Sequence, residues 1–205
     1  MTTNWIHYFG YGSLVNRDTR PADESALSAS LIGWQRVWGH RVTGPFGGQP
    51  CTSLSIEPKS CELASQSANS IDGVVVRISV EQLPDLDARE EGYERMVLPA
   101  SHFVLPEGFD GDVIMVYRSL EENRFPATTD CPILQSYIDC VMAGYLGRFG
   151  QDGLLSLMAS TKGWGLPTLN DRQAPFYPRH VTVDETHRHL FNQCISQAIK
   201  QEQAS

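Results

Sequence analysis

The chain of 205 residues has few lysines and no long apolar run. It contains three lysines, and 16 Lys and Arg residues stand against 24 Asp and Glu residues, for a formal net charge of −8. Because nucleic-acid binding relies on clustered basic side chains, this balance argues against a nucleic-acid partner. No apolar stretch approaches the roughly 20 residues of a membrane helix, and Met1–Ile6 lacks the pattern of a secretion signal. We therefore expect a cytoplasmic protein that has no membrane partner.

Paired cysteine motifs are also missing. The cysteines are odd in number and widely spaced, without a CxxC pair: Cys51, Cys61, Cys131, Cys140 and Cys194. This pattern predicts neither a disulfide framework nor a zinc site, and we expect reduced thiols that are mostly buried. His187 and His189 do not suggest a metal pair, because side chains two residues apart on a helix point to different faces. The sequence therefore predicts no metal site.

What is present is typical of an ordinary globular protein, with 41% hydrophobic and 20% charged residues. The length fits a single domain over residues 1–205. Glycines and prolines in Gly44–Pro50, and the polar stretch Cys61–Ser70, indicate a hairpin or loop excursion between strands. Alternating or apolar patterns predict strands over Ile6–Tyr11, Leu31–Val42, Ile71–Val80, Met96–Leu105 and Asp112–Ser119.

Helical patterns concentrate in the second half of the chain. Ser79 and Gln82 resemble a capping box that opens a helix through about Glu91, with Pro84 tolerated in its first turn. A long amphipathic helix is expected from Pro132 to Phe149, a short one near Leu154–Ser160, and a last one capped by Asp184. Since strands precede the long helices without regular alternation, we predict an α+β fold with a mixed or partly closed sheet and a helical portion from about residue 130.

The first candidate site is the glycine-rich segment Phe9–Leu14, FGYGSL, after the first predicted strand. It is not a dinucleotide fingerprint, because Val15 occupies the third glycine position, and it is not the GxSxG nucleophile elbow. Glycines let the backbone approach a ligand closely, and successive N–H groups in a turn can bind an anion. An ordinary tight turn is the alternative explanation.

The second candidate is Glu90, within Leu86–Arg95, LDAREEGYER. At 100° per residue, Glu90 falls between Leu83, Leu86 and Asp87, on the stripe that faces inward, whereas Glu91 lies about 100° further round. A buried carboxylate is costly unless it is paired, and desolvation raises its pKa toward the range useful for proton transfer. The alternative is a structural ion pair with Arg89, Arg95 or another basic group.

These two motifs together resemble the γ-glutamylcyclotransferase family, including its AIG2-like relatives. The resemblance rests on YGSL, Tyr11–Leu14, followed about seventy residues later by LDxRExGY, Leu86–Tyr93, and it covers roughly Ile6–Ser119. It implies a mixed, partly closed β-barrel flanked by helices, with a cavity between the turn and a catalytic glutamate. It also implies cyclisation of a small γ-glutamyl compound to 5-oxoproline, with release of an amine or amino acid and without a cofactor.

Position by position, the resemblance places the catalytic glutamate at Glu90 and the substrate-binding turn at Tyr11, Gly12, Ser13 and Leu14. The backbone N–H groups of the turn would hold either the substrate α-carboxylate or the developing oxyanion. Tyr93 matches a family tyrosine that could orient the substrate, although a core tyrosine is the alternative. Several family members have asparagine where this chain has Leu14, so one side-chain amide contact is lost and substrate choice is expected to differ.

A third segment, Trp164–Arg179, is rich in proline and aromatic residues. Its arginines could clamp a substrate carboxylate, but an ordered surface loop tied by a salt bridge between Asp171 and an arginine is the simpler interpretation, so Arg172 and Arg179 stay outside the predicted site. The alternatives to a cyclotransferase are a ligand-binding or regulatory protein on the same fold, and an amidase that releases glutamate. A monomer and a homodimer both fit the sequence.

Overall fold

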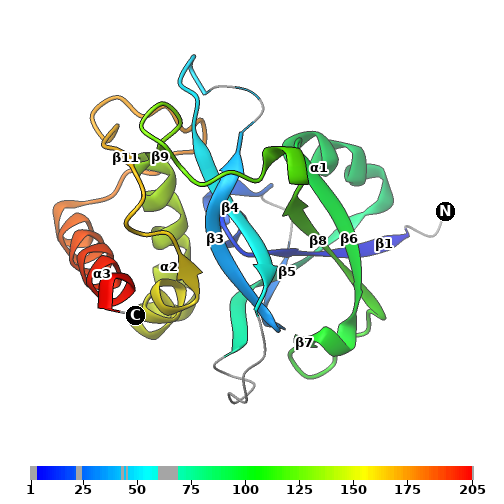
Figure 1. Ribbon diagram of the computed structural model, residues 1–205. Helices are drawn as coiled ribbons and strands as arrows, with labels where there is room; N and C mark the ends of the chain where they lie inside the picture. Colours follow the sequence, from blue (N-terminus) through cyan, green and yellow to red (C-terminus); the bar gives the residue numbers. More distant parts are fainter. Residues whose placement is uncertain (1–3, 22–24, 43, 45, 60–68, 205) are drawn as a thin grey trace.

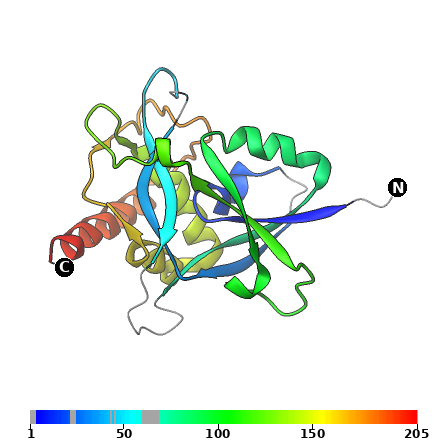
Figure 2. The ribbon, with the colours of Figure 1, turned by 45° about the vertical axis from the view of Figure 1, so that its right-hand side comes forward.

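The computed structural model describes residues 4–21, 25–42, 44, 46–59 and 69–204. In the described residues, two strongly curled sheets lie side by side, the longest helix contacts strands of both sheets, and the second-longest helix packs on the outer side of the longest one (Figures 1 and 2). The strands of the first sheet, in spatial order, are β6 (Tyr93–Pro99), β8 (Val113–Ser119), β1 (Trp5–Gly10), β5 (Ser70–Ser79), β2 (Ala26–Ile32) and β7 (Phe103–Val104). Those of the second sheet are β10 (Thr161–Lys162), β3 (Trp34–Arg41), β4 (Thr52–Pro58), β9 (Ile133–Leu134) and β11 (Thr168–Leu169).

The first sheet is mixed, as the sequence predicts. Strand β1 pairs antiparallel with β5 and parallel with β8, and it lies among buried side chains such as Tyr8 and Phe9. Its last residue, Gly10, therefore brings the chain into the interior of the molecule. A hydrogen bond from the Ser119 N–H in β8 to the Ser55 hydroxyl oxygen in β4, 2.9 Å long, joins the two sheets. This closure confirms the predicted α+β fold with a partly closed barrel.

The strand expected over Leu31–Val42 is two strands in different sheets. Gly33 adopts a φ of 81°, which L residues rarely adopt, and turns the chain from β2 into β3. The hairpin expected next does form, since β3 pairs antiparallel with β4 across the connection that contains Gly44–Pro50. Of the polar stretch Cys61–Ser70, residues 61–68 lie outside the described residues.

The strand predicted over Met96–Leu105 is also divided. Strand β6 begins three residues earlier and ends at Pro99, and a 3-10 turn over Ala100–His102 separates it from the short β7. The strand predicted over Asp112–Ser119 agrees with β8 to one residue.

Three α-helices complete the described part of the chain: α1 (Leu83–Arg89), α2 (Gln135–Ala159) and α3 (Glu185–Ala204). Helix α1 follows a 3-10 turn in which the Ser79 N–H donates to the Gln82 side chain at 2.8 Å, and Pro84 lies in its first turn, as expected. It ends at Arg89, before the predicted boundary.

Helix α2 begins at Gln135 rather than Pro132, because Ile133 and Leu134 pair with β4 and β11 as strand β9. A kink at Gly150, with φ 68°, separates the long helix from the segment predicted as a short one. The Asp184 side chain accepts a hydrogen bond from the His187 N–H at 2.8 Å and so caps α3, as predicted. Helices α2 and α3 lie together on one side of the second sheet (Figure 1).

Cys51, Cys131, Cys140 and Cys194 are free and buried, in agreement with the expected reduced thiols. Cys61 lies outside the described residues. None of the helices within the described ranges combines the length and the hydropathy needed to cross a membrane.

Candidate active site

The glycine-rich segment after β1 forms a tight 3-10 turn over Ser13–Val15 at one end of the barrel interior. Tyr11 and Leu14 are buried, with 7% of each exposed. A Cβ at Gly12 would lie 3.1 Å from the Tyr137 hydroxyl oxygen, so glycine allows the backbone to approach that group. Because the first N–H groups of a helical turn have no partner inside it, the turn can offer donors to a ligand.

Buried polar contacts fix this turn from behind. The Arg36 side chain is fully buried in β3, and its Nε donates to the Tyr11 carbonyl oxygen at 2.9 Å. The Tyr145 hydroxyl of α2 donates to the same oxygen at 2.9 Å. On the far side of the turn, the Asn16 side chain donates to the Cys140 carbonyl oxygen at 2.9 Å. The turn is therefore held by both the barrel and α2, which makes it a rigid platform.

Glu90 lies directly after α1, where its N–H still donates to the Leu86 carbonyl oxygen at 3.0 Å. Its side chain is 16% exposed, whereas Glu91 is an exposed residue. The helical-wheel argument thus chose the carboxylate that points inward, although the helix itself stops at Arg89. The Arg89 Nε lies 3.4 Å from a Glu90 carboxylate oxygen, so one of the structural ion pairs considered for Glu90 is present as well.

The pKa of Glu90 is raised above its ordinary value because burial disfavours the charged form. The positive charges of Arg89 and Arg179 oppose this effect without cancelling it. A carboxyl group whose pKa is raised is more readily protonated than an ordinary glutamate, which favours a role in general acid and base catalysis.

Tyr93, at the start of β6, is held in place by its hydroxyl group. The hydroxyl donates to the Leu54 carbonyl oxygen at 2.7 Å and lies 2.9 Å from the Ser53 hydroxyl oxygen. Its ring stacks on His40 with the centroids 3.7 Å apart. Burial raises the pKa of Tyr93 well above 10 and lowers the pKa of His40 to about 4, so both groups are neutral at physiological pH.

Two adjoining cavities meet at Glu90. An inner cavity of about 30 Å³ is lined by the glycine-rich turn, including Tyr11, Gly12, Ser13 and Leu14. An outer cavity of about 280 Å³ opens beyond it, and the two share Ser13, Glu90, Tyr93 and Tyr137. The structure therefore brings together every residue of the predicted site. The outer volume falls just below the roughly 300–1,000 Å³ of pockets for drug-sized ligands, which suits a small ligand.

Sequence reasoning missed several residues of the outer cavity: His40, Tyr137, Tyr177 and Arg179. Tyr137 lies on the amphipathic stripe of α2, so its periodicity indicated a core residue and carried no sign of a cavity. Arg179 belongs to the proline-rich loop, for which the sequence favours a structural role. The structure instead places Arg179 in the wall that contains Glu90.

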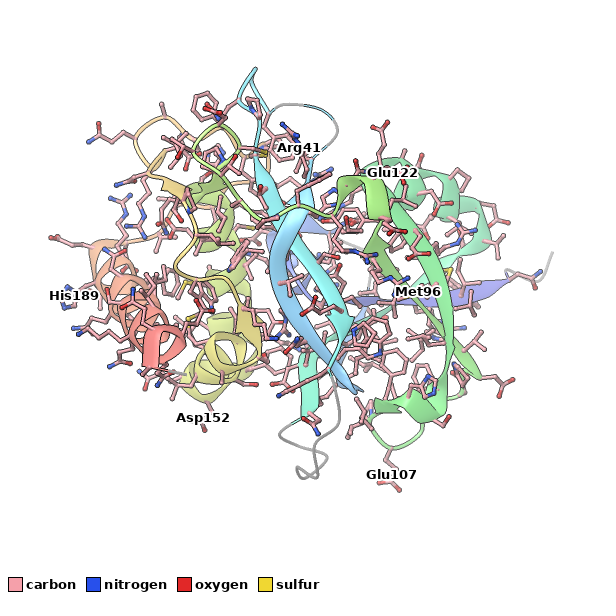
Figure 3. All side chains as sticks on the ribbon, in the orientation of Figure 1. Arg41, Met96, Glu107, Glu122, Asp152 and His189 are labelled. Atoms are coloured by element: carbon pink, nitrogen blue, oxygen red, sulfur yellow. The ribbon has the colours of Figure 1, made fainter. Side chains whose placement is uncertain are left out.

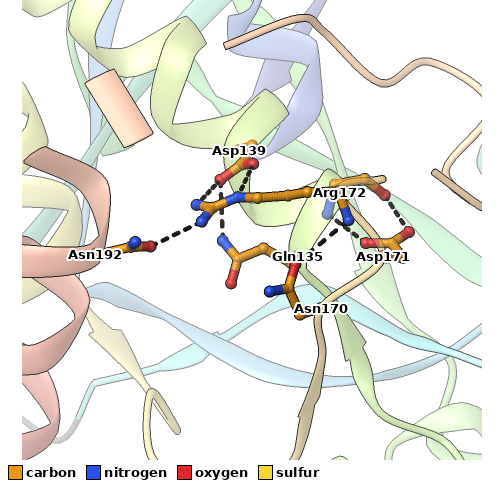
Figure 4. A network of polar contacts seen from close by, with 7 residues as sticks. Gln135, Asp139, Asn170, Asp171, Arg172 and Asn192 are labelled. Atoms are coloured by element: carbon orange, nitrogen blue, oxygen red, sulfur yellow. Dashed lines mark hydrogen bonds and ion pairs between the residues drawn. The ribbon is translucent and has the colours of Figure 1, made fainter. Parts of the chain in front are cut away.

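The other charged residues of that loop are structural, but their pairing differs from the expected one. Within the described chain, Asp171 forms no salt bridge with an arginine; it accepts hydrogen bonds from the Ser136 N–H and hydroxyl, at 2.7 and 2.6 Å. Arg172 binds Asp139 of α2 through two nitrogens, at 2.6 and 2.7 Å, and donates to Asn192 of α3 at 3.0 Å (Figure 4). This network joins the loop to both long helices.

The two histidines of α3 have local partners. The His187 Nδ1 lies 2.8 Å from an Asp184 carboxylate oxygen, and the His189 Nε2 lies 2.8 Å from the Gln193 side-chain nitrogen. His189 lies on the outer side of α3, away from the barrel (Figure 3). The described residues contain no group of three or more His, Cys, Asp or Glu side chains arranged for a metal ion.

No protein-family model and no curated protein matches the sequence. Solved structures do match. A structure titled gamma-glutamyl cyclotransferase aligns over 93% of this chain and 99% of its own, with 16% identity and a TM-score of 0.59. An uncharacterized human protein aligns over 92% and 98%, with 17% identity and a TM-score of 0.59. YkqA from Bacillus subtilis aligns over 78% of this chain and 56% of its own, with 17% identity and a TM-score of 0.53. The chain therefore has the fold of the γ-glutamyl cyclotransferases.

Proposed function

We propose that the protein is a γ-glutamyl cyclotransferase, which converts a small γ-glutamyl compound into 5-oxoproline and a free amine or amino acid. One observation carries the proposal. The Glu90 carboxyl group, with a raised pKa, shares a small cavity with the residues of the Tyr11–Leu14 turn, whose backbone can supply N–H donors. An acid–base group opposite a set of backbone donors is what an acyl transfer within one substrate molecule requires.

In the proposed reaction the substrate supplies its own nucleophile. The Glu90 carboxylate takes a proton from the substrate α-ammonium group, and the α-nitrogen then attacks the γ-carbonyl carbon. The bond between that carbon and the leaving nitrogen breaks as Glu90 gives this proton to the leaving nitrogen. The attacking nitrogen then gives up its second proton to the Glu90 carboxylate, which passes it to the departing amine, so that the products are a lactam N–H and an ammonium group. One N–C bond forms, one N–C bond breaks, and no water is consumed.

The turn would stabilise charge during this reaction. Its N–H groups would bind either the α-carboxylate of the substrate or the oxyanion that develops on the γ-carbonyl oxygen. Leu14 does not remove this capacity, because the backbone donors remain when the side-chain amide found in other members is absent. Closure of the ring also needs a folded substrate, and a rigid turn held by Arg36 and Tyr145 favours binding in one conformation.

The identity of the product tests the proposal. Purified protein is incubated with a panel of γ-glutamyl peptides, γ-glutamyl amines and glutathione, and the products are identified by mass spectrometry. We expect 5-oxoproline from at least one substrate with the wild type and none with Glu90→Gln.

The other outcomes identify the alternatives. Free glutamate in place of 5-oxoproline would make the protein an amidase. Saturable binding of the same compounds without any product, even at high protein concentration, would make it a binding or regulatory protein on this fold. Either result would overturn the proposed cyclisation.

A further inference from the structure

Arg179 is an exposed arginine in the wall of the outer cavity. None of the residues that the structure describes forms a hydrogen bond or an ion pair with its guanidinium group. Its charge nevertheless acts on the site, because Arg179 is one of the two cations that oppose the rise in the Glu90 pKa. The cavity wall thus presents a guanidinium group whose donors are available to a ligand.

The other arginine of this wall, Arg89, is in a different situation. Its Nη1 donates to the Thr19 carbonyl oxygen at 2.7 Å, and its Nε lies 3.4 Å from Glu90. Both contacts hold Arg89 against the protein, with 13% of its side chain exposed. The third guanidinium nitrogen of Arg89, Nη2, is buried without a hydrogen-bond partner in the described part of the chain. Arg89 is thus fixed beside Glu90, whereas the exposed Arg179 can bind a group that enters the cavity.

The position of Arg179 relative to Glu90 indicates which part of a bound substrate would contact Arg179. Of the turn residues, Tyr11, Gly12 and Leu14 line only the inner cavity. Ser13 and Glu90 line both cavities, and Arg179 lines only the outer one. The reacting γ-carbonyl must lie near Glu90, and the glutamyl unit must curl for its α-nitrogen to reach that carbonyl. The inner cavity, at about 30 Å³, has room for about one water molecule, so the glutamyl unit extends past the turn into the outer cavity beside Ser13 and Glu90, and the leaving group lies beyond it, toward Arg179.

We propose that Arg179 binds an anionic group on the amine that leaves, so that the preferred substrates are γ-glutamyl amino acids or peptides with a free carboxylate rather than γ-glutamyl amines. This assignment rests on the proposed cyclotransferase function. A guanidinium group matches a carboxylate with two parallel hydrogen bonds, and the charge of Arg179 repels a cationic group placed beside it. Glu91 also lines the outer cavity, and no ion pair with Arg179 is present among the described residues.

Three substrates that differ in the charge of the leaving group test the assignment. They are γ-glutamylalanine, its C-terminal amide and γ-glutamylputrescine, and 5-oxoproline formation is measured at low ionic strength to limit screening. For the wild type we expect kcat/KM to fall in that order, with about a tenfold difference between acid and amide. Arg179→Gln should remove most of that difference through a higher KM for the acid, and Arg179→Lys should keep part of it.

Arg188→Gln is the matched control, because Arg188 is an exposed arginine of α3 that lines none of the cavities described above. It should leave all three rates unchanged. If Arg179→Gln lowers the rates for the acid and the amide equally, Arg179 binds the glutamyl unit and the assignment is overturned. The assignment is also overturned if the wild type has the same kcat/KM for the acid and the amide.

Binding separates this assignment from the proposed reaction. Calorimetric titration of the Glu90→Gln protein and of the double variant Glu90→Gln/Arg179→Gln with γ-glutamylalanine and its amide needs no turnover. Tighter binding of the acid that disappears with Arg179→Gln supports the role of Arg179 even if the wild type makes no 5-oxoproline. Equal binding of acid and amide overturns it, whatever reaction the protein performs.

Discussion

Two carboxylates of this protein lie beside arginines, and their surroundings differ. Asp139 is 4% exposed, and it accepts two hydrogen bonds from Arg172 and a third, 2.9 Å long, from Gln135. Glu90 is 16% exposed, its contact with Arg89 is 3.4 Å long, and it lies in the wall of a cavity. Figure 4 shows the first arrangement, in which the arginine also reaches Asn192 of α3.

The comparison separates a structural ion pair from the carboxyl group that we propose as an acid and base. Both carboxylate oxygens of Asp139 accept hydrogen bonds from protein groups, so Asp139 joins structural elements and is poorly placed to bind a substrate. Glu90 has an incomplete set of partners and a raised pKa, which leaves it able to exchange a proton. Proximity to an arginine therefore does not decide the role of a buried carboxylate; the number of its partners and its access to a cavity do.

The largest expected effect is on catalysis at Glu90. Glu90→Gln should lower kcat by roughly 10²–10⁴-fold, the usual contribution of general acid–base catalysis, while the melting temperature stays the same or rises. Glu91→Gln, at the exposed neighbouring position, should leave kcat within about twofold, well below a general acid–base contribution. Steady-state kinetics and calorimetry on both variants test this prediction. A large loss of kcat in Glu91→Gln but not in Glu90→Gln would show that the proposed role belongs to Glu91.

The opposite effect is expected at Asp139. Asp139→Ala leaves the Arg172 guanidinium group, 14% exposed, without its carboxylate, and should lower the free energy of unfolding by about 3 kcal/mol. The rate per folded molecule should not change. The double variant Asp139→Leu/Arg172→Leu, measured by urea unfolding, should lose less stability than Asp139→Ala. Equal losses would show that the packing of α2, rather than the unpaired charge, determines the cost.

The burial of Glu90 could be predicted from the sequence, whereas the turn at Gly33 could not. Leu83 and Leu86 mark the buried face of the short helix α1, and Glu90 follows on the same face. The prediction that the helix continues to Glu91 is wrong by two residues, but this error does not change which face is buried. The turn at Gly33 could not be predicted, because buried residues lie on both sides of it. The alternating pattern of the sequence therefore continues from β2 into β3 without a break.

Arg179 could not be assigned for a different reason. It lies 89 positions after Glu90 in an irregular loop, where no periodicity indicates the direction of a side chain. The partner of Arg172 was equally hidden, since Asp139 is in a separate element and Asp171 stands next to the arginine in sequence. Local patterns predict which face of an element is buried, whereas contacts between elements depend on the tertiary structure.

The raised pKa of Glu90 predicts a specific dependence of stability on pH. Because the folded protein holds this proton more tightly than the unfolded chain does, stability should fall as pH rises from about 4.5, the ordinary value, up to the folded pKa. The cost is about 1.4 kcal/mol for each unit between the two pKa values. Glu90→Gln lacks this loss, so its advantage over the wild type should grow through that range and then level off.

Chemical denaturation of both proteins at a series of pH values measures this difference. An advantage of Glu90→Gln that shrinks as pH rises would mean that the attraction of Arg89 and Arg179 exceeds the desolvation of Glu90. Glu90 would then be a structural carboxylate of the same kind as Asp139, and the distinction drawn between them would fail.

The smallest effect is expected at a third carboxylate, which backbone groups hold instead of an arginine. Glu202, exposed near the end of α3, accepts hydrogen bonds from the N–H groups of Gly163, Trp164 and Gly165 at 2.6, 3.2 and 3.2 Å. Successive N–H groups of this kind form a concave anion site. Because water competes at this exposed position, Glu202→Ala should cost about 1 kcal/mol of stability, and Glu202→Gln, which keeps an acceptor oxygen, less.

Amide hydrogen exchange measures this locally. In Glu202→Ala the amides of residues 163–165 should exchange faster, while those of the barrel strands keep the rates of the wild type. Acceleration throughout α3 would show that Glu202 docks the whole helix. No change at residues 163–165 would show that the loop is held by the packing of the buried Trp164 instead. The hydrogen bonds from residues 163–165 would then orient the Glu202 side chain without stabilising the loop. The ion pair of Asp139 and Arg172, by contrast, is expected to stabilise the elements that it joins.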